Sequence, residues 1–145
     1  MVDQMSKGFL IFAQNTKDVD YVTQAYALAL SIKHTQTKVT NVSLVTNDEV
    51  PENYKSVFDQ IIEIPWVSEG DTESRYRAEH RWKLYYTTPY DETIVLDSDM
   101  LVLEDLSTWW TYCKHYDLQF CSRVKNYKSE IVHSSMYRKA FKENH

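Results

Sequence analysis

The chain has 145 residues, of which 43% are hydrophobic and 14% aromatic, and this composition predicts a globular domain rather than a disordered segment. The formal net charge of −5 argues against general nucleic-acid binding, which relies on an excess of lysine and arginine. The only glycines, Gly8 and Gly70, exclude a glycine-rich phosphate loop, so a bound nucleotide would need side chains and a metal ion instead.

Blocks of apolar periodicity predict strands and helices in alternation. In chain order we expect a strand at 9–13, a helix at 18–34, a strand at 42–45, a helix at 51–58, a strand at 60–64, a long polar loop at 66–79, a helix at 80–88, a strand that begins at 93 and ends at the aspartates 97 and 99, a second apolar run at 100–103 that is also typical of a buried strand, a helix at 106–114, a strand at 118–121 and helical character around 136–141. This order predicts an α/β fold with a mostly parallel central sheet and helices on both faces. We expect one domain over residues 1–145, with a core at about 8–122 and a tail at 123–145.

The cellular location is indicated by cysteine usage and by the amino-terminal residues. Cys113 and Cys121 show neither metal-ligand spacing nor a disulfide framework, as expected for reduced thiols. The first residues do not form a signal peptide, and no apolar run reaches the roughly 18 residues of a membrane span. We therefore expect a cytoplasmic protein without a membrane span.

Two aspartates at the end of an apolar run, Asp97 and Asp99, are the most informative motif. Burying an unpaired carboxylate is costly, so a charged end to a buried strand calls for a ligand. In extended backbone, residues i and i+2 point to the same side, so both carboxylates are expected to converge on one point. Two such oxygen ligands suit Mg²⁺ or Mn²⁺, and the small Ser98 leaves room for a ligand. The alternative is a solvated turn or a pair of loop caps.

Polar residues after the first strand form a second candidate site, because parallel sheets bind ligands at the carboxyl ends of their strands. Amide and hydroxyl groups there could read the edge of a base, and a tyrosine could stack on it. The candidates are Asn15, Thr16, Asp18 and Tyr21. The alternative is that Thr16 or Asp18 caps the following helix and that Tyr21 belongs to the core.

Cations precede the Asp-x-Asp motif and could balance a phosphate group. Lys83, on the helix that leads into the motif, could face a metal-bound diphosphate as a point charge. The others are Arg75, Arg77 and Arg81. The alternative is a solvated helix face on which Glu73 and Glu79 offset the positive charge.

Three segments together resemble GT-A fold glycosyltransferases, in particular family 8, which includes glycogenin and lipopolysaccharide galactosyltransferases. Residues 9–21, which include Ala13, are similar to the family's first strand and nucleotide-binding turn. Residues 81–84 (Arg-Trp-Lys-Leu) are similar to its helix whose lysine contacts the diphosphate, and residues 94–103 are similar to its metal-binding Asp-x-Asp strand. Residues 75–110 also resemble short glycosyltransferases encoded by bacteriophages, whose location would be the host cytoplasm.

The resemblance implies a Rossmann-like GT-A nucleotide-sugar-binding fold and a retaining glycosyltransferase. The donor would be a nucleotide-activated sugar, with a UDP-hexose as the first candidate, and the cofactor would be Mn²⁺ or Mg²⁺. Asp97 would lie near the ribose and the metal, Asp99 would ligate the metal, and Lys83 would add positive charge at the diphosphate. The metal would bridge the diphosphate and stabilise the leaving group.

The chain departs from the family in two respects. It has no His-x-x-Gly-x-x-Lys motif, which supplies a third metal ligand, and the acceptor-binding half of the usual domain is missing. The fold is therefore expected to be minimal or truncated on the acceptor side, and donor binding is better supported than transfer. Hydrolysis of the donor by water is plausible. The residues do not identify the catalytic base, the nucleophile or the acceptor. They also leave the oligomeric state open between a monomer and a homo-oligomer.

Three other functions were weighed. One is a nucleotide-sugar-binding module whose partner supplies the acceptor site. Another is a haloacid-dehalogenase-like phosphatase. Its motif requires threonine or valine two positions past the second aspartate, where this chain has Leu101. A sugar nucleotidyltransferase would need a glycine-rich loop that the sequence lacks.

Overall fold

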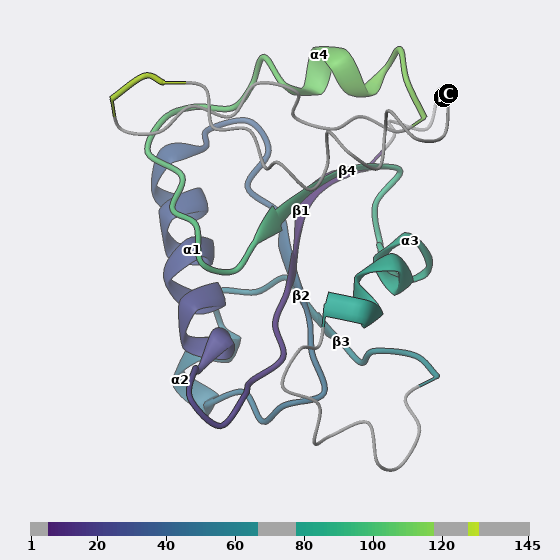
Figure 1. Cartoon of the computed structure of the whole chain (residues 1–145). Helices are drawn as coiled ribbons and strands as arrows, with labels where there is room; N and C mark the ends of the chain where they lie inside the picture. Colours follow the sequence, from purple (N-terminus) through teal and green to yellow (C-terminus); the bar gives the residue numbers. More distant parts are fainter. Residues whose placement is uncertain (1–5, 67–77, 118–127, 131–145) are drawn as a thin grey trace. The chain divides into compact units, whose positions relative to one another are not determined.

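The computed structural model describes residues 6–66, 78–117 and 128–130 (Figure 1). The chain divides into two compact units, Met1–His115 and Tyr116–His145, and the account below concerns the first. The strand expected at 118–121 and the helical character expected around 136–141 lie outside the described residues. The expectation of a single domain stays a prediction.

The first unit is built on a four-stranded parallel sheet. In chain order its elements are β1 (Lys7–Phe12), α1 (Tyr21–Thr35), β2 (Val42–Val45), α2 (Glu52–Lys55), β3 (Gln60–Ile62), the 3-10 helix η2 (Ala78–Lys83), α3 (Leu84–Thr87), β4 (Glu92–Asp97) and α4 (Trp110–Cys113). The strand order is β3-β2-β1-β4, and every pairing is parallel. The expected α/β class with a parallel sheet flanked by helices is therefore confirmed.

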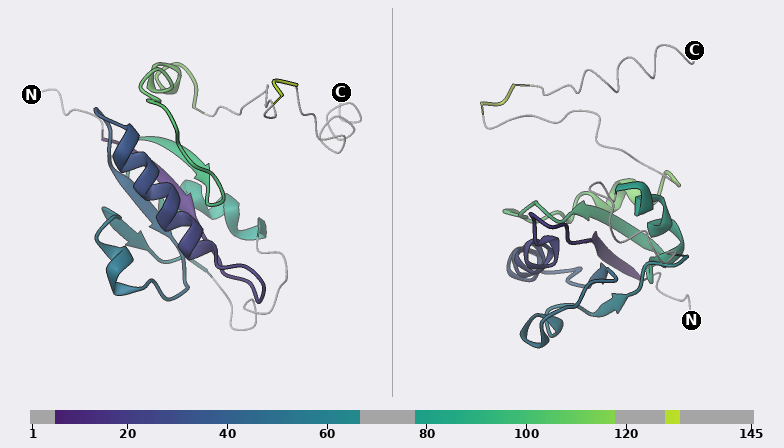
Figure 2. Two further views of the ribbon diagram at one scale, coloured as in Figure 1. Left: turned by 90° about the vertical axis from the view of Figure 1, so that its left-hand side faces the viewer. Right: turned by 60° about the horizontal axis from the view of Figure 1, so that its bottom comes forward.

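Helices cover both faces of the sheet because β1 alternates its side chains between two apolar clusters. Phe9 and Ile11 join the cluster that contains α1, whereas Leu10 and Phe12 join the cluster that contains Leu84 of α3. Figures 1 and 2 show α1 along one face of the strands and α3 on the other. The apolar periodicity that predicted the helix at 18–34 corresponds to the buried face of α1, which consists of Val22, Ala25, Leu28, Ala29 and Ile32.

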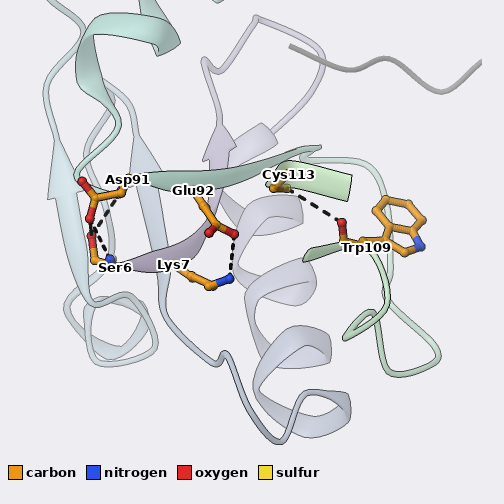
Figure 3. Close-up of polar contacts among 6 residues, drawn as sticks. All are labelled: Ser6, Lys7, Asp91, Glu92, Trp109 and Cys113. Carbon is orange, nitrogen blue, oxygen red and sulfur yellow. Dashed lines mark hydrogen bonds and ion pairs between the residues drawn. The ribbon is translucent and has the colours of Figure 1, made fainter. Parts of the chain in front are cut away.

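Polar contacts tie the amino-terminal ends of β1 and β4 together (Figure 3). The backbone N–H and hydroxyl of Ser6 both donate to Asp91, at 2.7 and 2.9 Å, and this lowers the pKa of that carboxyl. The Lys7 ammonium lies 2.7 Å from Glu92 on the neighbouring strand. These contacts lie at the edge opposite the strand ends that carry the candidate site.

The first helix begins later than expected and has a different cap. Asp20 is the capping residue, and its carboxylate accepts hydrogen bonds from the Thr23 backbone N–H at 2.9 Å and the Thr23 hydroxyl at 2.7 Å. These two bonds lower the pKa of Asp20. The prediction that Thr16 or Asp18 caps this helix is wrong. The Thr16 hydroxyl instead accepts from the N–H groups of Asp18 and Val19, which closes a local turn before the helix.

Other elements also differ in length from the sequence-based expectation, and the helix expected at 80–88 is a 3-10 helix, η2, followed by one turn of α-helix, α3. The strand expected to end at the two aspartates does end at Asp97, because the Met100 N–H donates to the Asp97 carbonyl at 3.2 Å and turns the chain. The second apolar run is therefore not a strand, and Met100, Leu101 and Leu103 are exposed. The helices expected at 51–58 and 106–114 shorten to α2 and α4, since tighter i→i+3 turns flank both.

Candidate functional site

The candidate site lies where the strand order of the sheet reverses. From β1 the chain moves to β2 and β3 on one side, and then places β4 on the other side. Phe12, the last residue of β1, is the register partner of Asp97, the last residue of β4. In open parallel sheets such a reversal leaves a crevice at the carboxyl ends of the strands, where ligands bind. The pairing of β1 with β4 therefore brings the carboxyl ends of these two strands together.

Asp97 is paired with an arginine from the preceding helix. The two guanidinium nitrogens Nη1 and Nη2 of Arg81 donate to Oδ2 and Oδ1 of Asp97 at 3.0 and 2.7 Å. Both side chains are partly exposed, at 51% for Arg81 and 32% for Asp97. The structure therefore brings together two of the predicted site residues. It also gives the Asp97 carboxylate a cationic partner, so a metal ion would have to share or displace Arg81.

Asp99 lies in the turn after β4 and is exposed. The expected convergence of Asp97 and Asp99 assumed extended backbone, and that assumption is wrong because the chain turns at Ser98 and Asp99. Ser98 is only 2% exposed, so its hydroxyl is packed away from solvent. If Asp97 and Asp99 bind one ligand together, the turn after β4 has to position their carboxylates, because the two residues do not lie on one extended strand.

A divalent cation at this edge of the sheet would depend on few protein ligands. Within the described ranges, no group of three or more His, Cys, Asp or Glu residues could hold a metal ion. Mg²⁺ usually takes one or two carboxylates together with substrate phosphates, and Asp97 and Asp99 fit that smaller requirement. Gln14 is 7% exposed, and among the described residues its amide oxygen has no hydrogen-bond partner. A buried acceptor of this kind is costly unless a ligand or water satisfies it.

Gln14 was missed in the sequence analysis, although it stands among the polar residues that follow β1. The signal that could have found it is position, since it is the second residue past the strand partner of Asp97. Asp48 was also missed. Its carboxylate accepts from the Asn15 backbone N–H at 2.6 Å and so ties the turn after β1 to the end of β2.

Three of the four polar candidates after β1, Asn15, Thr16 and Tyr21, have side-chain partners, and Asp18 donates its backbone N–H to the Thr16 hydroxyl. The side-chain oxygen of Asn15 accepts from the Val22 N–H at 3.0 Å, and this bond fixes the start of α1. Tyr21 is half-buried against the cluster that contains α1. Ala13 is buried and its N–H donates to the Val45 carbonyl at 3.0 Å. These bonds hold the turn after β1 in one conformation. The exposed atoms of the turn are left to contact a ligand.

Lys83 is not a surface lysine, so that alternative is wrong. The residue is only 4% exposed, and its ammonium donates to the Trp66 carbonyl at 3.1 Å. A neutral carbonyl compensates a buried charge poorly, so this ammonium favours a nearby anion. The other cations, Arg75 and Arg77, lie outside the described residues.

No model of a known protein family matches this chain, and no curated protein matches it either. In the described part of the chain, no helix is long and apolar enough to cross a membrane.

A surface hollow at the other edge of the sheet is less suited to the predicted chemistry. It lies at the amino-terminal ends of the strands and is lined in part by Lys7, Lys38 and Trp110. Lys7 is already engaged there by Glu92 at 2.7 Å and lies over the Trp110 ring. The hollow contains none of the residues that the sequence singled out.

Proposed function

We propose that this chain is a metal-dependent glycosyltransferase of the GT-A fold that takes a nucleotide-activated sugar, with a UDP-hexose as the first candidate. One observation carries the proposal. Asp97 of the Asp-x-Asp motif ends β4 directly beside the end of β1, where the strand order reverses. This is the position at which α/β sheets bind nucleotides.

The residues around this point divide naturally by chemistry. The turn after β1, with Asn15, Thr16 and Asp18, would contact the nucleoside. Asp97 and Asp99, with Gln14 as a neutral oxygen donor, would hold the divalent cation. When bound, Mn²⁺ or Mg²⁺ would neutralise the diphosphate and stabilise the departing nucleoside diphosphate.

Two cations of the protein would act on the same diphosphate. Arg81 is half-exposed and presents two parallel donors, which match a phosphate as well as they match the Asp97 carboxylate. Lys83 supplies a buried ammonium on the same element. When the cation binds, Arg81 would leave Asp97 and turn its guanidinium to the phosphates. The Arg81–Asp97 pair would then be replaced by two pairs, one between Asp97 and the cation and one between Arg81 and a phosphate.

The proposal is tested by thermal unfolding with UDP and with UDP-glucose, each with and without Mn²⁺. A ligand at 100 times its Kd stabilises a protein by about 2.7 kcal/mol, which is a readily measured shift. We expect this stabilisation only when the metal is present, and we expect Asp99→Ala to abolish it. Glu104→Ala is the matched control, because this exposed acid lies beside Gln36 at the far end of α1.

Turnover separates a transferase from a binding module. Release of UDP from UDP-glucose, followed over long incubation at high protein concentration, is the expected sign of transfer or donor hydrolysis. Metal-dependent binding without any release would instead identify a nucleotide-sugar-binding module. Equal stabilisation with and without the metal would contradict the proposal as a whole.

A further inference from the structure

Four aromatic side chains gather on the surface beside the candidate site, and the sequence analysis did not identify them. We call them the aromatic patch: Trp66, Trp82, Tyr85 and Tyr86, with exposed fractions of 66%, 59%, 82% and 62%. Exposed apolar groups that gather in one place mark interaction sites more often than scattered ones do. Sequence spacing could have identified three of them, because residues i, i+3 and i+4 of a helix share one face, and Trp82, Tyr85 and Tyr86 have this spacing.

The rings of the patch contact one another. Trp66 and Trp82 are stacked with centroids 6.1 Å apart and an interplanar angle of 16°. Tyr86 meets both indoles edge-on, at 5.4 Å from Trp66 and 6.0 Å from Trp82. Tyr85 in turn meets Tyr86 edge-on at 5.2 Å. Mutual contacts of this kind hold exposed rings in defined orientations.

The backbone at Trp66 adds a second, independent observation. Its φ is 54°, in the left-handed region that residues other than glycine rarely adopt. Its carbonyl accepts the hydrogen bond from the buried Lys83 ammonium. The protein thus maintains an unfavourable backbone conformation at the residue whose ring stacks on Trp82, and such conformations cluster at ligand-binding sites.

The patch and the candidate site share one element. Arg81, Trp82 and Lys83 are consecutive in η2, and Arg81 makes the two-point ion pair with Asp97. A molecule that lies on Trp82 is therefore adjacent to the residues that we assign to the donor diphosphate. Continuity with that site indicates that the occupant of the patch is the second substrate.

The chemistry of the patch selects the class of that substrate. Aromatic faces are electron-rich and attract the polarised C–H groups on the flat face of a sugar ring. Indole N–H and phenol O–H groups can bond to the hydroxyls at its rim, and every side chain of the patch carries one of these groups. The net charge of −5 disfavours anionic lipid surfaces and nucleic acids.

We propose that the aromatic patch binds a neutral oligosaccharide as the acceptor, a role that rests on the glycosyltransferase function proposed above. The probes are neutral hexasaccharides: maltohexaose and cellohexaose, which are built from glucose, and the hexasaccharides of N-acetylglucosamine and of xylose. Binding is measured by indole fluorescence and by calorimetry. We expect at least one of them to bind. Tyr85→Ala should weaken that binding at least tenfold and leave the metal-dependent UDP stabilisation unchanged. Trp82→Ala should also weaken saccharide binding at least tenfold, but it is not a test of the donor site, because the Trp82 ring lies 5.9 Å from the Lys83 ammonium.

Tyr112→Ala is the matched control, because this tyrosine is also exposed, at 55%, but lies on α4. It should leave saccharide binding unchanged. Tyr85 is 82% exposed, so its truncation tests the patch without endangering the fold. If no saccharide binds while UDP and Mn²⁺ do, the inference fails and the proposed function survives. If UDP does not bind, the proposed function fails first.

Two other occupants are distinguished by further measurements on the same proteins. Sedimentation velocity over a concentration series detects association with a second copy of the chain, and flotation with phosphatidylcholine vesicles detects a neutral bilayer surface. A Tyr85-dependent dimer, or Tyr85-dependent vesicle binding, without a saccharide response would overturn the acceptor assignment.

Discussion

Arg81 and Asp97 form a two-point ion pair in which Nη1 of the guanidinium donates to Oδ2 of the carboxylate at 3.0 Å and Nη2 donates to Oδ1 at 2.7 Å. The pair links η2 to the end of β4 and occupies the carboxylate that the motif offers to a metal ion. In the absence of a ligand the acidic motif is thus partly neutralised by the protein itself. Cation binding and release of Arg81 should therefore be coupled.

Replacement of Arg81 by glutamine should have opposite effects on the two ligands. A partly exposed pair contributes about 1 kcal/mol or less, so Arg81→Gln should tighten Mn²⁺ binding alone by about two- to fivefold. The same variant should bind UDP with Mn²⁺ more weakly, because a phosphate partner is lost. Calorimetric titration measures both. Lys55→Gln, which breaks the exposed Lys55–Glu52 pair, is the control, and weaker Mn²⁺ binding by Arg81→Gln would contradict the coupling.

Lys83 should be more important for ligand binding than for stability. Lys83→Met keeps the buried stem and removes the ammonium, whose only bond among the described residues is to the Trp66 carbonyl. The desolvation cost of the charge disappears, so urea denaturation should show unchanged or higher stability. UDP binding with Mn²⁺ should weaken about tenfold, the equivalent of about 1.4 kcal/mol. Unchanged UDP affinity would remove Lys83 from the donor site.

A side chain at Gly8 should disrupt the contact between β1 and the turn before β4. A Cβ at this position would clash with the Tyr90 ring, which is fixed by a hydroxyl contact of 2.7 Å with Ser43. Overpacking of this kind costs about 1–3 kcal/mol, so Gly8→Ala should lower the free energy of unfolding by that amount. In a Tyr90→Ala background the same substitution should cost much less, as a double-mutant cycle with urea denaturation will show.

The cap of α1 should produce a pH-dependent contribution to stability. Hydrogen bonds from the Thr23 backbone and hydroxyl lower the pKa of Asp20 below its ordinary value of 3.8, so the folded state favours the charged form. Asp20→Ala should lose about 0.5–2 kcal/mol near pH 7. That loss should shrink as the pH falls from about 4 toward 2, because the unfolded chain then binds the proton first.

Two neighbouring substitutions provide the comparison for this cap. Asp20→Asn keeps an oxygen acceptor for the helix but has no titrating group, so its stability should lack the acid-dependent part. Asp18→Ala removes an exposed aspartate that does not cap the helix, and it should leave stability nearly unchanged. Equal losses for Asp18→Ala and Asp20→Ala would contradict the assigned cap.

Local pattern was sufficient to predict the class of the fold. The strand at Val42–Val45 was predicted residue for residue, and the buried stripe of α1 followed from helical periodicity. The strand and the buried face of α1 both depend on which neighbouring residues along the chain are apolar, and the sequence gives this directly. Element ends were harder, because caps and turns are decided by competition between nearby polar groups such as Thr16, Asp18 and Asp20.

The sequence by itself determined that a parallel α/β sheet would form and that Asp97 would stand at the end of a strand. Only the tertiary structure decided that β4 lies next to β1, that Arg81 pairs with Asp97, and that Lys83 is buried. The order of the strands and the place of a helix on the sheet depend on how whole elements pack against each other. No spacing along the chain encodes the distance between side chains that meet only after this packing.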